Sequence, residues 1–81
     1  MATAASAADC GGSIVQTTSS SGIREWTMTW TNCAGLSSRK KIDIAYGPDL
    51  GCQTIPAGSW RSWTYAVSGL NPAHPRGFKN C

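Results

Sequence analysis

The stretch Ile23–Thr31, with the sequence IREWTMTWT, carries the clearest structural signal in this chain. Large apolar side chains, Trp26, Met28 and Trp30, alternate there with threonines. A period of two places the apolar side chains on one face of a β-strand and the threonines on the other. We therefore expect a strand whose tryptophan-bearing face is turned toward a core.

Shorter β-prone runs lie on both sides of this stretch. We expect strands over residues 13–18, 40–46, 50–55 and 62–67, separated by turns rich in glycine, proline and serine. From Gly69 onward, prolines and glycines predict an irregular loop that contains His74. Five or six short strands at this spacing indicate an all-β fold, a small antiparallel sandwich or barrel. The expected core is formed by Trp30, Ile42, Ile44, Tyr46, Trp63 and Tyr65.

The length of 81 residues allows one domain. Charged residues make up 14% and hydrophobic residues 41%, which excludes the composition typical of disordered chains. The small residues at positions 1–8 resemble the end of a signal peptide, so we expect a disordered remnant there and a folded domain over residues 9–81. The net charge of +3 is scattered. The cluster at residues 39–41 is interpreted as a solvated turn, and no nucleic-acid partner is expected.

Four widely spaced cysteines indicate a protein of an oxidising compartment. An even number of cysteines in a small domain is typical of a disulfide framework, and we expect secretion. Three pairings are open. We favour Cys10 with Cys33 and Cys52 with Cys81, because each pair flanks one expected hairpin. The spacing lacks a CxxC pair, so we expect no metal site and no cofactor.

Little in the sequence supports catalysis. The single histidine, His74, lies in the expected terminal loop, and no nucleophile motif accompanies it. The four acidic residues show no suggestive pair for glycoside hydrolysis. We therefore expect a protein that is not an enzyme and has no catalytic residue.

Two stretches combine tryptophan with arginine, residue types that are enriched at the centres of protein interfaces. Trp60 and Arg61 follow the turn at residues 56–59, and Arg24 and Trp26 follow a serine-rich loop. We take these four residues as candidates for binding a partner. Either stretch can equally be a cation–π pair that supports the fold.

The second half of the chain resembles the tendamistat-type α-amylase inhibitors of Streptomyces. The resemblance covers about residues 32–81 and rests on the step Asn32-Cys33-Ala34, on Cys52 followed by IPAGSW at residues 55–60, and on the last Cys81. It implies a secreted six-stranded β-sandwich with disulfides paired in sequence order. The step GPDLGC at residues 47–52 is also similar to small secreted actinobacterial proteins.

The resemblance implies binding to an extracellular hydrolase by a monomer. Those inhibitors carry a Trp-Arg-Tyr triplet in the first disulfide loop, whereas this chain has Arg24 and Trp26 there and places Trp60 and Arg61 in the second loop. Our first hypothesis is an inhibitor of a hydrolase such as α-amylase. A secreted antimicrobial or toxin-like protein that contacts membranes is the alternative, and a structural cell-surface protein is the third.

Overall fold

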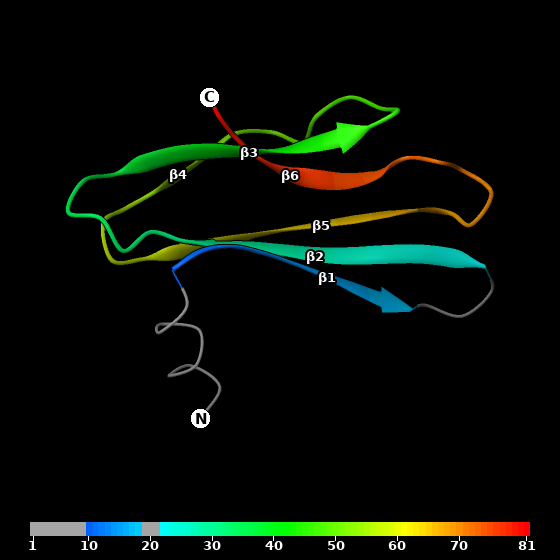
Figure 1. The fold of residues 1–81 in the computed structure, drawn as a ribbon, viewed down its shortest axis with the longest axis horizontal. Coiled ribbons are helices and arrows are strands. Elements are labelled where there is room, and N and C mark those ends of the chain that lie inside the picture. The colour runs from blue at the N-terminus through cyan, green and yellow to red at the C-terminus, as the bar shows by residue number, and fades with distance from the viewer. Residues whose placement is uncertain (1–9, 19–21) are drawn as a thin grey trace.

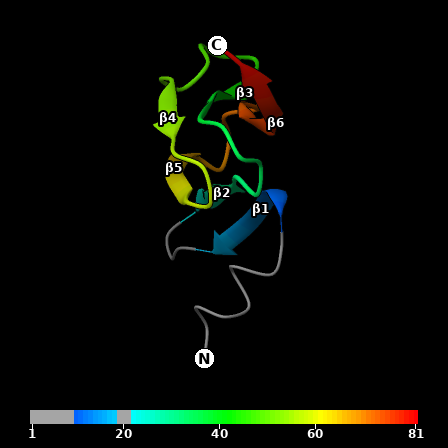
Figure 2. The same cartoon turned by 90° about the vertical axis from the view of Figure 1, so that its left-hand side faces the viewer.

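The computed structural model describes residues 10–18 and 22–81. Within these residues it confirms the expected all-β class. Two antiparallel sheets, with strand orders β1-β2-β5 and β4-β3-β6, face each other as a sandwich (Figures 1 and 2). No helix in the described residues is long and apolar enough to span a membrane. The strands are β1 Gly11–Thr18, β2 Ile23–Thr31, β3 Ser38–Ala45, β4 Gln53–Ile55, β5 Trp60–Ser68 and β6 His74–Asn80.

The core lies between the middle strands of the two sheets. β2 covers the stretch expected from its alternation, and its apolar face packs inward. Antiparallel pairing sets Met28 opposite Trp63 of β5 and Trp26 opposite Tyr65, so the large side chains of two strands share one face. The alternating Ile42 and Ile44 of β3 complete this core from the other sheet. Its buried members are Trp26, Met28, Ile42, Ile44, Ile55, Trp63 and Ala73.

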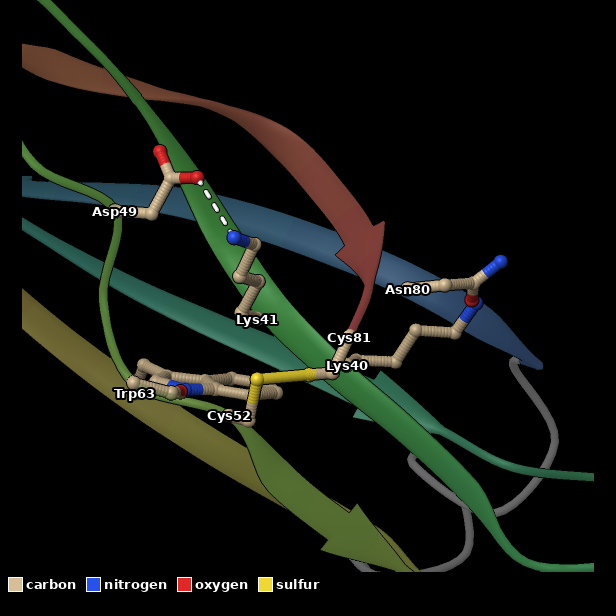
Figure 3. The surroundings of a disulfide bond; sticks show 8 residues. Lys40, Lys41, Asp49, Cys52, Trp63, Asn80 and Cys81 are labelled. Atoms are coloured by element: carbon tan, nitrogen blue, oxygen red, sulfur yellow. Dashed lines mark hydrogen bonds and ion pairs between the residues drawn. A yellow bond between two sulfur atoms is a disulfide. The ribbon is translucent and has the colours of Figure 1, made fainter.

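Both favoured disulfides are present. Cys10 pairs with Cys33, and Cys52 pairs with Cys81. The second disulfide lies beside the ring of Trp63 (Figure 3). The indole Nε1–H of Trp63 donates to the carbonyl of Gly51 at 2.9 Å, so the one polar atom of this buried ring is satisfied. Each disulfide thus joins strand ends within one sheet, Cys10–Cys33 at β1 and β2 and Cys52–Cys81 at β4 and β6.

The end of the chain corrects the expected irregular loop. Residues 74–80 form β6, which pairs antiparallel with β3 and places His74 in a strand. Pro75 lies in an edge strand, where the missing N–H of proline is tolerated. The register shifts beside Asp43 and Ile44, which accommodates this irregular segment.

Tyr46 corrects the expected core. β3 ends at Ala45, and Tyr46 adopts a left-handed backbone with φ of 61°. Its ring is turned out of the sandwich and is 78% exposed. The expected burial of Ile42, Ile44 and Trp63 is confirmed, whereas Trp30 and Tyr65 are only half-buried. The strand expected over residues 50–55 is shorter in the structure, because β4 begins at Gln53 and leaves Cys52 outside it.

Candidate binding surface

Arg24 and Trp26 lie against the protein itself. They are two residues apart on β2, so their side chains share a face. Trp26 is only 6% exposed, and the Arg24 guanidinium lies 5.1 Å from the centre of its ring. Arg24 Nη2 donates to the carbonyl of Asn71 and, at 3.3 Å, to that of Ala73. This pair therefore holds the β5–β6 connection on β2, a different setting from the exposed loop expected for binding.

Trp60 and Arg61 do not form a pair in space. They are consecutive residues of β5, so their side chains point to opposite faces of the sheet. Trp60 lies opposite Thr31 on the outer face and is 51% exposed, the largest exposure among the four tryptophans. Arg61 lies opposite Trp30 on the inner face and donates to its neighbours, the hydroxyl of Ser59 and the carbonyl of Trp60.

The backbone that carries Trp60 is fixed by Asn32. The side chain of Asn32 is buried, with 4% exposure, and its amide donates to the carbonyls of Leu36 at 2.8 Å and Ile55 at 2.9 Å. Its Oδ1 accepts the N–H of Ala34 at 3.0 Å. The backbone of Asn32 also pairs with Ser59 and with Gly58, each at 2.8 Å. One residue therefore joins the β2–β3 loop to the turn before Trp60.

We call this region the Asn32 end: loop residues 32–37, turn residues 56–59 and Trp60. Both segments lie at the same end of the sandwich (Figure 1). Gly58 has a φ of +72°, which glycine adopts at no steric cost, and Ser59 N–H donates to Pro56 at 3.0 Å, closing the turn. The Cys10–Cys33 disulfide adjoins Asn32 and holds the loop to the start of β1. The backbone before Trp60 is thus held by hydrogen bonds to Asn32 and within the turn.

A hollow at the Asn32 end is lined by Trp30, Leu36 and Lys40 together with other residues of the β2–β3 loop and of the start of β1. The ammonium of Lys40 lies 4.5 Å from the centre of the Trp30 ring and donates to the Asn80 side chain. The Trp30 ring therefore already has a cationic partner from the protein. Trp60 is left as the tryptophan with a large face open to solvent.

The opposite end, which we call the Arg24 end, comprises Arg24, residues 46–49 and the connection 69–73. Its exposed apolar side chains include Tyr46 and Leu70, the latter almost completely exposed at the tip of a turn. The ring of Tyr46 lies 6.2 Å from that of His74. Tyr46 and Leu70 lie at the other end of the sandwich from the buried, hydrogen-bonded side chain of Asn32, whereas Trp60 follows a turn that Asn32 holds.

Two carboxylates near the Arg24 end form ion pairs with lysine and arginine side chains. Asp43 lies within 3.4 Å of Arg76 and Lys79, and Asp49 within 3.6 Å of Lys41 and Lys79. Figure 3 shows Lys41 reaching Asp49. Asp49 also accepts the N–H of Ile44 at 3.1 Å, and this hydrogen bond, reinforced by the lysines, lowers the pKa of Asp49 below its ordinary value. An acid held ionised in this way is a poor proton donor.

His74 has a local partner rather than a catalytic one. Its Nδ1 lies 2.9 Å from the carbonyl of Pro72. In the part of the chain that the structure describes, no three His, Cys, Asp or Glu side chains gather at metal-binding distance. Asn32 and its network were missed by the sequence analysis, where Asn32 counted only as one position of a motif.

No known protein family, curated protein or solved structure matches this chain. The resemblance to the tendamistat-type inhibitors therefore stays a prediction from the motifs. The two disulfides in a small protein are compatible with an extracellular location.

Proposed function

We propose that this chain is a small secreted binding protein that inhibits an extracellular hydrolase such as an α-amylase, with Trp60 as its main anchor. One observation carries the proposal. Trp60 is half-exposed, and its backbone is fixed by the Asn32 network and the turn at residues 56–59. Tryptophan is enriched among the residues that dominate binding energy. Rigid backbone lowers the entropy lost when a partner binds.

The proposal uses binding rather than catalysis. An enzyme needs an activated nucleophile or a proton donor near its working pH. Asp43 and Asp49 are held by cations, and all four cysteines are in disulfides. Arg24 and Trp26, candidates from the sequence, do not enter the proposed contact because they pack on each other and on residues 71–73.

The test is an inhibition panel of α-amylases and extracellular proteases. It compares the natural sequence with Trp60→Ala and with Leu70→Ala, which removes an exposed apolar side chain at the other end. We expect saturable one-to-one inhibition that Trp60→Ala weakens by at least about thirtyfold, as for interface hot spots. Leu70→Ala should leave it unchanged. Absence of inhibition across the panel, or equal loss in both variants, would reject the proposed site.

The antimicrobial alternative receives less support. Binding to anionic lipid needs a face of free cations. Lys41, Arg76 and Lys79 each lie within salt-bridge distance of Asp43 or Asp49. Anionic vesicles added to the same panel test this alternative. It predicts vesicle binding that weakens as salt rises, because exposed charges are screened.

A further inference from the structure

The two sheets have four edge strands, β1 and β5 in one sheet and β4 and β6 in the other. An edge strand presents unpaired N–H and C=O groups to any other extended chain. Monomeric proteins protect such edges by shortness, proline, charge or cover. The four edges of this protein differ sharply in these protections.

Three edges are protected. β4 has only three residues. β6 contains Pro75, Arg76 and Lys79. The edge of β5 faces β4, where Gln53 Nε2 donates to the carbonyl of Ser62 at 2.8 Å. Each of these features opposes the addition of another strand.

β1 has none of these protections in the described residues. Its sequence GGSIVQTT contains no charge and no proline over eight residues. Residues 12–17 are exposed, including the apolar Ile14 and Val15, which point to opposite faces of the sheet. Among the described residues, β1 pairs with β2 alone. A long uncharged edge with exposed β-branched residues is suited to accept a strand.

The start of this edge is held in place. Cys10 is joined to Cys33 directly before β1. Gly12 lies under the ring of Phe78, where an added Cβ would come within 2.3 Å of the ring. The missing side chain thus lets β6 pack on β1, and Figure 2 shows both strands on the same side of the sandwich. A pre-positioned edge loses little freedom when another strand pairs with it.

We propose that β1 pairs antiparallel with β1 of a second copy of this chain, which joins the two β1-β2-β5 sheets into one six-stranded sheet. In antiparallel pairing, residues directly opposite share a face. A two-fold axis at Ile14 therefore sets the two Ile14 side chains directly opposite each other on the inner face, and sets each Val15 opposite Ser13 of the other copy on the outer face. A second copy thus supplies an apolar match for Ile14.

The charge distribution permits a second copy at this edge. Each molecule has a net charge of +3, but β1 has no charged residue, so like charges do not face each other along the paired strands. The Arg76 and Lys79 of β6, above this edge, are paired with Asp43. Pairing of two eight-residue strands buries a small interface, so we expect a weak, concentration-dependent dimer. This departs from the monomer expected from the sequence and does not depend on the proposed inhibition.

Sedimentation velocity from about 10 µM to about 1 mM tests the proposal over the range of weak interfaces. Val15→Lys adds a charge on the edge strand, and Thr64→Lys adds the same charge on the exposed outer face of β5 as the matched control. We expect the natural sequence and Thr64→Lys to dimerise. Val15→Lys should raise the dissociation constant at least about tenfold, because an edge lysine opposes strand pairing.

Two further measurements keep the outcome decisive. Thermal unfolding establishes that each variant is folded, and Ser13→Lys, on the same face of β1, replaces Val15→Lys if that variant is not. Amide exchange should slow in β1 as the concentration of the natural sequence rises. A monomer at all concentrations overturns the proposal. So does a dimer that both lysine variants weaken equally, or β1 protection seen only when a hydrolase is added.

Discussion

The two ends of the sandwich each carry a tryptophan and an arginine close together in the sequence, and they differ in what these residues contact. At the Arg24 end, Arg24 lies over Trp26 and both face the protein. At the Asn32 end, Trp60 faces solvent and Arg61 lies on the other face of the strand. The spacing explains the difference. Residues two apart in a strand share a face and can stack, whereas consecutive residues cannot.

The ends also differ in how their loops are held. A buried amide, Asn32, joins two connections at one end. A half-exposed guanidinium and a carboxylate, Arg24 and Asp49, hold the connections at the other. Buried hydrogen-bond hubs are costly to remove, while exposed contacts contribute less. The comparison therefore predicts an order of mutational effects.

The largest effect is expected for Asn32→Ala. The substitution leaves the buried carbonyl of Ile55 without its 2.9 Å donor and removes the link to Leu36. We expect the free energy of unfolding to fall by about 3 kcal/mol, since several buried groups lose partners together. Denaturant unfolding with the disulfides intact measures this loss.

Asn71→Ala is the matched control for that substitution. Asn71 is an exposed asparagine at the Arg24 end, and its Oδ1 accepts the N–H of Ala73 at 2.9 Å. We expect a loss of about 1 kcal/mol for this single local hydrogen bond. Equal losses in the two variants would contradict the contrast between the ends.

A smaller effect separates the two arginines. Arg24→Glu removes the cation from the Trp26 ring and the donor from two backbone carbonyls, so we expect a loss of about 2 kcal/mol in unfolding free energy. Arg61→Glu removes contacts only to adjacent residues, and its cost should stay below about 1 kcal/mol. Thermal unfolding of both variants at one pH compares them directly.

Measurements of inhibition distinguish a binding role of Arg24 from a structural one. If Arg24 were a partner anchor, Arg24→Glu would abolish inhibition without lowering stability. The contacts of Arg24 instead predict that Arg24→Glu lowers the free energy of unfolding, and that any loss of inhibition accompanies this loss of stability. A variant with unchanged unfolding and lost inhibition would return Arg24 to the binding surface.

Strong local patterns made part of the fold predictable. β2 follows its alternation over the whole stretch, and both sequential disulfides are present. The expected hairpin lies between Cys10 and Cys33, where β1 pairs with β2. Within the described stretch between Cys52 and Cys81 the expected hairpin is absent, because β4 and β6 pair with β3 and β5 pairs with β2. Tyr46 could not be placed by alternation, because a left-handed residue at the strand end reverses the direction of its side chain. β6 was missed because its pairing with β3 is non-local and outweighs the local preference of Pro75.

The candidate site was predictable to a smaller degree. The alternation rule already implies that Arg24 and Trp26 share a face, and that Trp60 and Arg61 do not. Asn32 gave no such signal. Its importance depends on the approach of residues 55–59, more than twenty positions away, to its side chain. Only the folded structure brings these segments together.

The smallest effect is expected for Asp49→Asn, and it depends on pH. The hydrogen bond from Ile44 and the neighbouring lysines hold the pKa of Asp49 below its ordinary value of 3.8. A carboxyl whose pKa is lowered by folding stabilises the protein above its unfolded pKa, and this contribution is lost as the pH falls through the folded pKa. The natural sequence should therefore be the more stable near neutral pH. Its advantage over Asp49→Asn should shrink below pH 3.8.

Salt separates the two causes of this lowered pKa. The ion pairs with Lys41 and Lys79 are partly exposed and are screened in about 1 M salt, whereas the hydrogen bond from Ile44 is not. Because that hydrogen bond is the larger cause, most of the pH-dependent difference in unfolding midpoint should survive added salt. Thermal unfolding from about pH 7 to about pH 2, at low and high salt, measures it. A difference that disappears in salt would show that Asp49 holds the loop through its lysines. A difference that is constant with pH would show that the ionised carboxylate of Asp49 does not hold the loop.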